Sequence, residues 1–456
     1  MPLIKSISGF RGTIGGKPDA GLTPVDIVKL TSAFVCLVRR TGVNRPRIVV
    51  GRDGRISGTM VNQLVCGNLQ AMGADVIDIG LSTTPTVEVA VTEMKADGGV
   101  IITASHNPKE WNALKLLNNK GEFISKVDGE WLLKKAADDE YEFSSIDEIG
   151  TYTQEYDWIE RHVDMVCNLD LVDRELIAKT NLKVVVDAVN STGGLAIPML
   201  LKKLGITDII ELNCDITGDF AHNPEPLASN LTEICNKVKE CGADLGIVVD
   251  PDVDRLAFIN DKGEMYGEEY TLVSVASYVL QNKKGNTVSN LSSTRALRDV
   301  TQEYGGEYFA SAVGEVNVVE KMKEVNAVIG GEGNGGVIYP ELHYGRDALV
   351  GIGLFLTYLC KLQCSCSELK SRFPIYHMSK NKIELTPSTD VDEILTFMAD
   401  KFKNEKVTTI DGVKIDFDEG WVHLRKSNTE PIIRIYSEGK TISEAEKFAK
   451  LIVDSL

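Results

Sequence analysis

A serine and a histidine stand side by side at the end of an apolar, strand-like segment. The run reads Thr103-Ala-Ser-His-Asn-Pro108, so Ser105 is expected in the turn at the carboxyl end of a strand, where α/β proteins bind ligands. The hydrolase pattern G-x-S-x-G is absent, because Thr103 and Asn107 occupy its glycine positions. The motif alone therefore fits two interpretations, a serine nucleophile or a plain turn broken by Asn-Pro.

Three carboxylates alternate along the segment Asp250-Pro-Asp-Val-Asp-Arg255, again at the end of an apolar run. Alternate residues of an extended chain point to one side, so the aspartates would concentrate negative charge. Such a cluster is costly unless a cation neutralises it, and carboxylate oxygens suit Mg²⁺. An EF-hand does not fit, because the sixth position is Arg255 rather than glycine and the twelfth is Asp261 rather than glutamate. The remaining alternative is a solvated acidic turn.

A glycine-rich loop, Gly330-Gly-Glu-Gly-Asn-Gly-Gly336, follows a further apolar segment. It lacks the pattern G-x-x-x-x-G-K-[ST] of a phosphate cradle and the helical context of a dinucleotide site. Glu332 offers a hydrogen-bond acceptor and Asn334 offers both a donor and an acceptor, which suits neighbouring sugar hydroxyls. The alternative is a tight loop without a ligand.

A donor-rich segment, Arg425-Lys-Ser-Asn-Thr-Glu-Pro431, lies between two strand-like runs, and Arg434 follows it. Guanidinium and hydroxyl donors together bind a phosphate dianion, although a surface hairpin would have a similar composition. The four segments together offer a serine nucleophile, a divalent-metal site, groups that bind sugar hydroxyls and a phosphate clamp. This combination indicates phosphoryl transfer on a phosphosugar.

The elements that must position these loops alternate between short apolar runs and longer helical patterns. Such runs, rich in Val and Ile, are typical of buried parallel strands in α/β layers; they cover residues 47–51, 98–103, 182–187, 246–250 and 327–330. The acidic, aperiodic stretch 138–150 and the change of pattern around 365–374 indicate exposed joints.

The C-terminal part has a different pattern, which predicts a small α+β domain with an antiparallel sheet. We expect a hairpin turn at Asp418-Glu-Gly420, and a last helix that opens with the capping box Thr441-Ile-Ser-Glu444. The expected strands cover 376–385, 408–417, 420–427 and 431–439, with a helix over 390–403.

Composition limits the class of protein. The chain has 456 residues, enough for two to four domains, and 49 basic against 66 acidic residues give a net charge of −17. This charge argues against a protein that coats nucleic acid or an anionic membrane, but not against a small anionic substrate.

Targeting and redox features indicate a cytoplasmic protein. The longest apolar stretch, 348–360, is too short to cross a bilayer, and the N-terminus has no secretory signal pattern. The nine cysteines are scattered and odd in number, which favours reduced thiols over a disulfide framework. Cys360, Cys364 and Cys366 lack a fourth zinc ligand at finger-like spacing.

On the four motifs, in this order and spacing, the sequence resembles the α-D-phosphohexomutases, the phosphoglucomutase/phosphomannomutase superfamily, essentially from end to end. The resemblance implies an α/β fold with a heart-shaped, four-domain architecture: three related α/β domains with mixed sheets and a C-terminal α+β domain. It places the phosphoserine loop in residues 1–150, the metal-binding loop in 151–255, the sugar-recognition loop in 256–370 and the phosphate-binding loop in 371–456.

The resemblance also implies the roles of individual residues. Ser105 matches the serine that is phosphorylated in the active enzyme, and its phosphate completes the shell of one Mg²⁺ held by Asp250, Asp252 and Asp254. Lys115 matches a lysine proposed for proton transfer, which His106 would assist. Arg11 matches an arginine near the phosphoserine, and Arg255 is the partner of the metal motif. Glu332 and Asn334 match the sugar-recognition loop, and the loop that grips the non-reacting phosphate contains Arg425, Ser427, Asn428, Thr429 and Arg434.

Several positions depart from the common family pattern. Asn334 stands where many members have serine, Gly336 where many have histidine, and Asn428 where glycine is common. Asparagine is the residue that best tolerates a positive φ after glycine, so the turn at Asn428 should form. Glu315 occupies a region where some hexose-phosphate members carry histidine.

The resemblance implies a Mg²⁺-dependent phosphohexomutase, an isomerase that interconverts hexose 6-phosphates and hexose 1-phosphates through a phosphoserine enzyme. A sugar bisphosphate is the intermediate and the activator. The loop GEGNGG and the opening LIKSISGFRGTIGG look most like phosphoglucosamine mutases, with phosphomannomutase/phosphoglucomutase as the alternative. A phosphosugar phosphatase and a non-catalytic sugar-phosphate sensor remain as alternatives of other classes. We expect a monomer or homodimer that acts on a small phosphosugar and binds neither nucleic acid nor membrane.

Overall fold

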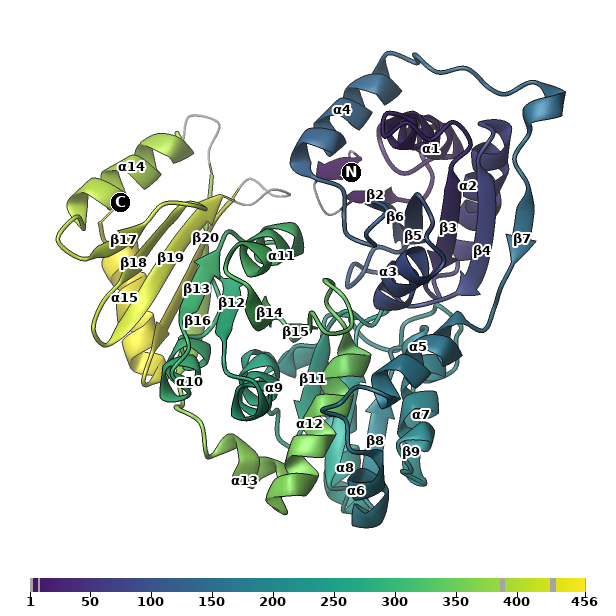
Figure 1. Cartoon of the computed structure of the whole chain (residues 1–456). Coiled ribbons are helices and arrows are strands. Elements are labelled where there is room, and N and C mark those ends of the chain that lie inside the picture. The colour runs from purple at the N-terminus through teal and green to yellow at the C-terminus, as the bar shows by residue number, and fades with distance from the viewer. Residues whose placement is uncertain (1–2, 7–8, 386–389, 427–431, 456) are drawn as a thin grey trace. The chain divides into compact units, whose positions relative to one another are not determined.

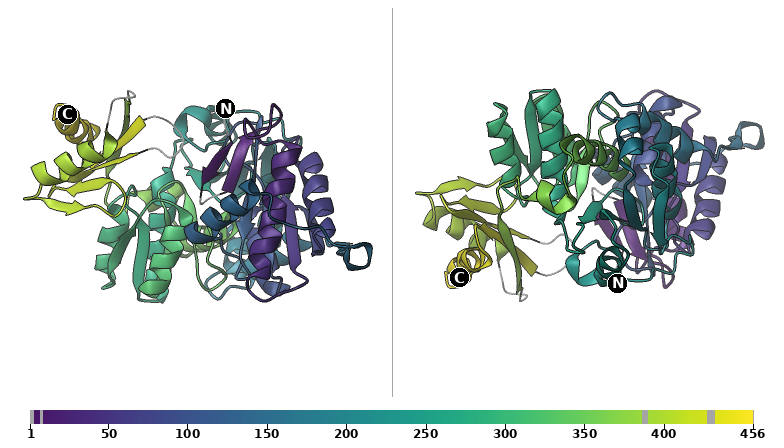
Figure 2. Two further views of the ribbon diagram at one scale, coloured as in Figure 1. Left: turned by 90° about the horizontal axis from the view of Figure 1, so that it is seen from above. Right: turned by 90° about the horizontal axis from the view of Figure 1, so that it is seen from below.

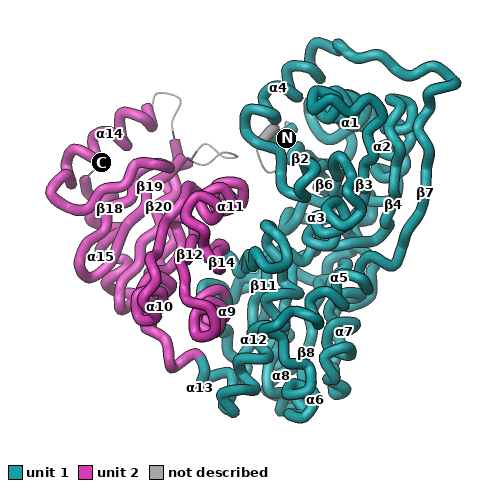
Figure 3. The backbone as a smooth tube through the Cα atoms, in the orientation of Figure 1, with its two compact units in different colours: residues 1–271, 334–369 teal, residues 272–333, 370–456 magenta. Residues whose placement is uncertain are grey.

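The computed structural model describes residues 3–6, 9–385, 390–426 and 432–455. The chain forms two compact units (Figure 3): the first contains residues 1–271 and 334–369, and the second contains residues 272–333 and 370–456. Each unit is described by itself below. Among the described residues, no helix combines the length and the apolar character that a membrane span requires.

The first sheet of unit 1 is mixed and has the strand order β1-β2-β6-β5-β3-β4-β7 (Figure 1). Strands β5, β3, β4 and β7 run parallel, whereas β6, β2 and β1 are joined to them by antiparallel pairs. The strands are β1 (Ile4–Ser6), β2 (Gly9–Thr13), β3 (Arg47–Arg52), β4 (Asp75–Leu81), β5 (Gly98–Ile102), β6 (Trp111–Leu117) and β7 (Tyr152–Gln154).

Helices cover both faces of this sheet, which can be followed in Figure 2. The central residues of β3 and β5 are buried, as expected for parallel strands with helices on both sides. One face packs against α1 (Pro24–Arg39), α2 (Gly58–Ala71) and α4 (Lys126–Ala137), and the other against α3 (Thr84–Glu93). After α4 the stretch predicted as a joint is mostly exposed, contains the 3-10 turn η1 (Ile146–Glu148), and leads into β7.

A second mixed sheet in unit 1 has the order β11-β10-β8-β9, in which only the β10–β11 pair is antiparallel. Its strands are β8 (Lys183–Asp187), β9 (Asp208–Leu212), β10 (Leu245–Val249) and β11 (Leu256–Ile259). The surrounding helices are α5 (Trp158–Cys167), α6 (Arg174–Thr180), α7 (Gly193–Lys203), α8 (Thr232–Cys241) and the turn η2 (Ala228–Asn230). Unit 1 also contains β15 (Gly336–Ile338) and α12 (Ala348–Leu362), and α12 packs on α5, α6 and β11.

In unit 2, β12 (Asn286–Asn290) lies between β13 (Tyr308–Ser311) and β14 (Ala327–Glu332) and pairs in parallel with both. The helices of this region are α9 (Glu268–Asn282), which precedes β12, α10 (Ala296–Glu303) and α11 (Glu315–Glu324). The short helix α13 (Cys366–Lys370) precedes the C-terminal sheet. The strands predicted at 47–51, 98–103, 182–187, 246–250 and 327–330 are therefore confirmed within one or two residues at their ends.

The C-terminal part of unit 2 has an antiparallel sheet of order β16-β20-β19-β18-β17, with its core between the sheet, α14 and α15. Its elements are β16 (His377–Glu384), α14 (Val391–Lys401), β17 (Lys406–Thr408), β18 (Val413–Asp416), β19 (Gly420–Lys426), β20 (Ile432–Gly439) and α15 (Ile442–Val453). The antiparallel α+β prediction and the capping box at Thr441 are confirmed.

The expectation of one continuous strand over 408–417 is wrong. Strand β17 ends at Thr408 and β18 begins at Val413, and the two pair as an antiparallel hairpin. The chain reverses through Asp411-Gly412, where Gly412 has a φ of +67°. Because glycine adopts a positive φ without a steric penalty, this pair terminates the strand.

Candidate functional site

Ser105 lies in a tight turn at the end of β5. Its φ of +48° is in the left-handed region, and its N–H donates to Thr103 Oγ1 at 2.9 Å. Its hydroxyl donates to Asp250 Oδ2 at 2.8 Å, although the two residues are 145 positions apart. The serine predicted as nucleophile and the first of the predicted metal ligands are thus brought together in unit 1.

The turn is held from behind by Arg55, a residue that the sequence analysis did not single out. The Arg55 guanidinium is buried and donates to four carbonyl oxygens of the loop, at 2.6–2.9 Å, those of Ser105, Asn107, Pro108 and Trp111. Asp53 accepts from Arg55 Nε at 3.0 Å and from Thr103 Oγ1 at 2.7 Å. The sequence did contain a signal for this contact. Asp53 and Arg55 follow the apolar run of β3, and charges that are buried at a strand end need partners.

The three aspartates follow β10, and all are fully buried. One carboxylate oxygen from each lies within 4.8 Å of the others. They do not lie along an extended strand, as the alternating pattern suggested, but in a loop that begins after Val249. Asp250 Oδ1 accepts from the N–H groups of Asp254 and Arg255, and Val253 has a φ of +63°. A β-branched residue in the left-handed region is strained, and such strain is typical of functional loops.

Basic and hydroxyl groups surround the outer oxygens of this cluster. Lys115 Nζ lies 2.6 Å from Asp252 Oδ2 and 3.3 Å from Asp254 Oδ2. Arg346 Nη2 donates to Asp254 Oδ2 at 2.7 Å, and Thr84 Oγ1 donates to Asp252 Oδ2 at 2.6 Å. Lys115 was predicted from the family motif, whereas Arg346 and Thr84 belong to segments that no motif indicated.

The oxygen atoms of the aspartates fit a divalent cation. In the described part of the chain, Asp252 Oδ1 and Asp254 Oδ1 are buried without a hydrogen-bond partner, which is costly for a carboxylate. Burial and the neighbouring charges of Asp254 and Asp252 raise the pKa of Asp250 well above its ordinary value. A hard cation with oxygen ligands, such as Mg²⁺, would satisfy these oxygens and offset the repulsion.

The protonation of the neighbouring groups follows from the same charges. Burial lowers the pKa of Lys115, but the carboxylates of Asp252 and Asp254 outweigh it, so the net pKa is raised. Burial also holds the pKa of His106 well below its ordinary value, with the charges of Arg255 and Arg11 acting in the same direction. Lys115 is therefore an ammonium and His106 a neutral imidazole at neutral pH.

The remaining predicted residues of this region lie beside Ser105 or the aspartates. His106 Nδ1 is 3.4 Å from the hydroxyl of Ser105, and Arg11, on β2, donates to Asn107 Oδ1 at 3.2 Å. Arg255 directly follows Asp254 and forms an ion pair of 3.1 Å with Glu225. Unit 1 thus places cationic side chains around a serine and an acidic cluster.

Asn334 lies in a loop of unit 1 that contacts the start of β11. Its side-chain oxygen accepts from the N–H of Gly336 at 3.2 Å, and the carbonyl of Gly335 accepts from the N–H of Leu256 at 3.1 Å. Gly335 has a φ of +89°, and a Cβ there would lie 2.2 Å from the Leu256 carbonyl oxygen. Only glycine allows the backbone at position 335 to lie this close to Leu256. The contact fixes the loop next to Leu256, the residue that follows Arg255.

Glu332 lies in unit 2, at the end of β14, and its side chain is buried. Its Oε1 accepts from Asn290 Nδ2 at 2.8 Å and from the N–H of Gly314 at 3.0 Å. Gly314 is the N-cap of α11, and Glu315, also buried, is the first residue of that helix. Glu332 therefore fixes the glycine that precedes Glu315.

Arg425 and Arg434 face each other in unit 2, as Cα partners on the adjacent strands β19 and β20. Arg425 also forms an ion pair of 3.3 Å with Asp411. Like charges directly opposite each other destabilise a sheet unless an anion offsets them. The other predicted phosphate-binding residues, Ser427, Asn428 and Thr429, lie outside the described residues.

Family models for four successive domains match almost the whole chain. Three describe the alpha/beta/alpha domains I, II and III of phosphoglucomutase/phosphomannomutase and match residues 4–142, 160–263 and 267–376. The fourth describes the C-terminal domain of the same family and matches residues 383–455. The chain therefore has a four-domain architecture, with three α/β/α domains that contain mixed sheets and a C-terminal domain with an antiparallel sheet.

Individual relatives match along the full chain. A phosphoglucomutase/phosphomannomutase of Thermococcus kodakarensis is 37% identical over 446 residues, which cover 96% of each chain. A phosphoglucosamine/phosphogalactosamine mutase of Sulfurisphaera tokodaii is 34% identical over 454 residues, again 96% of each. The crystal structure of a phosphoglucomutase/phosphomannomutase family protein of Burkholderia thailandensis superposes with a TM-score of 0.84 at 27% identity, and the match covers 99% of this chain and 97% of the other.

Proposed function

Because this chain belongs to the phosphoglucomutase/phosphomannomutase family of α-D-phosphohexomutases, we propose that it is a Mg²⁺-dependent mutase that moves a phosphoryl group between the 6- and 1-positions of a hexose phosphate. The observation that carries this proposal is the 2.8 Å hydrogen bond between Ser105 and Asp250 at an acidic cluster ringed by cationic side chains. A nucleophilic serine needs such charge compensation, because phosphoryl transfer spreads negative charge over several oxygens.

The metal would be held by Asp250, Asp252 and Asp254, together with an oxygen of the phosphorylated Ser105. When bound, Mg²⁺ neutralises charge on the oxygens of the transferring group. The residues of the chain supply the rest: Arg55 fixes the backbone of the serine turn, and Lys115 and Arg346 hold the outer oxygens of the aspartates.

In the proposed cycle, the phosphorus–oxygen bond of phosphoserine 105 breaks as a bond forms to the free hydroxyl of the sugar phosphate. The hydroxyl proton passes to a base of the site, for which the neutral imidazole of His106 is the candidate, and the ammonium of Lys115 is the candidate donor that returns a proton to the serine oxygen. The sugar bisphosphate then reorients and returns its other phosphate to Ser105, so no atom is gained or lost. A bisphosphate supplied from solution would also phosphorylate Ser105 and thus activate the enzyme.

The other predicted residues would bind the parts of the substrate that do not react. Arg425 and Arg434 suit the distant phosphate because guanidinium groups at facing strand positions can both donate to its oxygens, and Ser427, Asn428 and Thr429 would complete that loop. Glu332 and Asn334 would contact the sugar hydroxyls. Arg11 and Arg255 would bind the phosphate on Ser105.

For the sugar, we propose glucosamine 6-phosphate, which is converted to glucosamine 1-phosphate, because the sugar loop resembles that of phosphoglucosamine mutases. Glucose and mannose phosphates are the second candidates, and the Thermococcus relative favours them. We also propose that the protein works in the cytoplasm as a monomer or homodimer on small phosphosugars.

The test is a comparison of kcat/KM for glucosamine, N-acetylglucosamine, glucose and mannose 6-phosphates, with the products identified by phosphorus NMR. Formation of the 1-phosphate isomer supports the mutase, and the largest kcat/KM identifies the sugar. Release of free phosphate without the isomer would instead indicate a phosphatase. Binding without turnover of any of them would indicate a sugar-phosphate sensor.

A further inference from the structure

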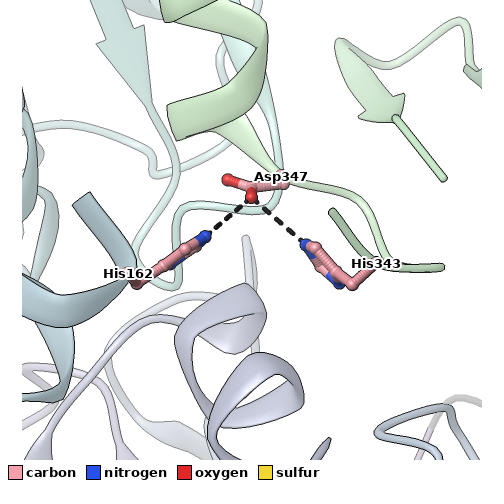
Figure 4. A group of neighbouring side chains, drawn as sticks. All are labelled: His162, His343 and Asp347. Atoms are coloured by element: carbon pink, nitrogen blue, oxygen red, sulfur yellow. Dashed lines mark hydrogen bonds and ion pairs between the residues drawn. The ribbon is translucent and has the colours of Figure 1, made fainter. Parts of the chain in front are cut away.

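Figure 4 shows a second group of potential metal ligands in unit 1, whose members differ from the three aspartates. His162 on α5, His343 and Asp347 converge with their ligand atoms within 4.8 Å of one another. Both Nε2 atoms point at the same carboxylate oxygen, Asp347 Oδ2, at 2.9 Å from His162 and 3.2 Å from His343. All three side chains are buried, with exposed fractions of 0%, 7% and 1%.

The outer nitrogen of each imidazole faces a polar side chain. His162 Nδ1 lies at hydrogen-bond distance, 2.9 Å, from Thr86 Oγ1, whereas His343 Nδ1 lies 3.3 Å from Glu88 Oε2 as an ion pair without hydrogen-bond geometry. Histidines that bind a metal through one nitrogen almost always place the other against a carboxylate, hydroxyl or carbonyl, which fixes the ring and its tautomer. His162 therefore has the surroundings of a metal ligand, and His343 has a carboxylate within ion-pair distance of its outer nitrogen.

The orientation of Asp347 is fixed as well. Its Oδ1 accepts from the N–H groups of Leu349 and Val350 and so caps α12, which leaves Oδ2 directed at the histidines. Zn²⁺ binds imidazole nitrogen and carboxylate oxygen at about 2.0–2.2 Å in tetrahedral geometry, so two ligand atoms of one ion lie about 3.3 Å apart. The observed separations of 2.9 and 3.2 Å are close to this value.

Charge favours a divalent cation at the same place. Glu88 and Asp347 bring two carboxylates into a buried region, with side-chain exposures of 1% each. A divalent cation held by two neutral imidazoles would balance the charge of these two carboxylates. An uncompensated buried charge is destabilising, and a neutral group is not.

We propose that His162, His343 and Asp347 bind a divalent transition metal of the Zn²⁺ class, with a structural rather than catalytic role. Imidazole ligands distinguish this site from the all-oxygen aspartate cluster, because they favour Zn²⁺ over Mg²⁺. The metal joins α5 to the segment that carries Arg346, the residue next to Asp347 that donates to Asp254. It therefore holds a cationic side chain of the aspartate cluster in position.

The first test uses the full-length wild-type chain produced in medium supplemented with Zn²⁺ or Co²⁺, because a buried site is filled most readily during folding. After dialysis against excess Mg²⁺, we expect one Zn²⁺ or Co²⁺ per chain by elemental analysis. X-ray absorption of the Zn²⁺ protein should show the scattering of two imidazoles. A metal content well below one per chain, or a spectrum with oxygen ligands only, would show that the group is a hydrogen-bonded network that holds protons instead.

Variants separate this site from the aspartates. His343→Gln keeps a side chain that can hydrogen-bond to Asp347 but removes a ligand, so the retained metal should be lost. Glu88→Gln should weaken Zn²⁺ binding by about 10- to 100-fold, as measured by competition with a chromophoric chelator. Asp252→Asn should still retain one Zn²⁺ or Co²⁺ ion per chain.

The matched control is His222→Gln. It removes a histidine that contacts an aspartate, Asp187, at 3.0 Å but belongs to no group of three ligands in the described part of the chain. This variant should retain the metal. Equal metal content in His343→Gln and His222→Gln would overturn the proposal. Loss of the retained metal in Asp252→Asn but not in His343→Gln would also overturn it. The X-ray absorption result on the wild type decides the matter if His343→Gln does not fold.

Discussion

The hydroxyl of Ser105 donates a hydrogen bond of 2.8 Å to Asp250 Oδ2, across 145 residues of sequence. The serine follows β5 of the first sheet, and the aspartate follows β10 of the second. Ligands of α/β proteins bind at the carboxyl ends of strands, and here the ends of two sheets meet at one point. The predicted nucleophile and the predicted metal ligand therefore lie at one site.

Replacement of Ser105 by alanine should lower kcat by at least about 10³-fold, because it removes the hydroxyl that carries the phosphoryl group in the proposed cycle. The measurement is mutase activity with the sugar bisphosphate present, together with mass spectrometry for a phosphorylated peptide that contains Ser105. Ser125→Ala, which removes a helix N-cap instead, is the control and should keep normal turnover. Near-normal activity of Ser105→Ala would show that the nucleophile is a different residue.

Magnesium should stabilise the protein as well as activate it. At about 100 times its Kd, a ligand of the folded state adds about 2.7 kcal/mol to the free energy of unfolding. We expect a rise in Tm on addition of Mg²⁺ to the chelator-treated protein, and a smaller rise for Asp252→Asn. Asp147→Asn, at an exposed position, should respond like the wild type. An equal rise in Tm for the wild type, Asp252→Asn and Asp147→Asn would show that Mg²⁺ binds at a different site.

Arg425→Ala should raise KM by about 10- to 100-fold and leave kcat nearly unchanged. A charge-assisted hydrogen bond contributes about 1.5–3 kcal/mol, and a grip on the non-reacting phosphate acts equally in ground and transition states. Steady-state kinetics with the best hexose phosphate provide the measurement. Arg298→Ala, which breaks an ion pair with Asp299, is the control. A loss confined to kcat would contradict the assigned role of Arg425.

Glu315 should favour an amino sugar over a plain hexose. It is buried at the start of α11, after the glycine that Glu332 holds, and a carboxylate there attracts the protonated amine of glucosamine phosphate. Glu315→Gln should therefore lower kcat/KM for glucosamine phosphate about 10-fold relative to glucose phosphate. Equal losses on both sugars would leave Glu315 with a packing role only.

Acid should destabilise the first sheet through Asp75. Hydrogen bonds from Arg45 and, more weakly, from Thr151 lower the pKa of Asp75 despite partial burial, which acts in the opposite direction. A carboxylate with a lowered folded-state pKa stabilises the protein above its unfolded pKa of about 3.9, and this contribution is lost as the pH falls further. Asp75→Asn should thus lower the free energy of unfolding by about 1 kcal/mol at pH ~7 and by much less at pH ~3.

Urea unfolding of wild type, Asp75→Asn and Asp147→Asn at both pH values checks this prediction. Asp147 is exposed and serves as the control for removal of one negative charge. If the difference in free energy of unfolding between wild type and Asp75→Asn grew toward low pH, its sign would be wrong for a lowered pKa of Asp75. That result would exclude the ion pair with Arg45 as the cause.

The sequence by itself determined the elements and the motifs at their ends. Buried parallel strands have continuous apolar runs, and polar residues directly after such a run must lie at the sheet edge. This local relation was enough to single out Ser105 and Asp250. The hairpin at Asp411-Gly412 was missed because the apolar pattern continues on both sides of a turn that one glycine creates.

Only the tertiary structure decided which distant side chains complete the sites. Arg55, Thr84 and Arg346 contact the serine turn or the aspartates from segments whose own patterns are those of ordinary loops and helix starts. The group of His162, His343 and Asp347 likewise joins residues up to 185 positions apart. Strand and helix patterns record local burial along the chain, whereas the pairing of buried charges depends on how separate elements pack, which no local pattern specifies.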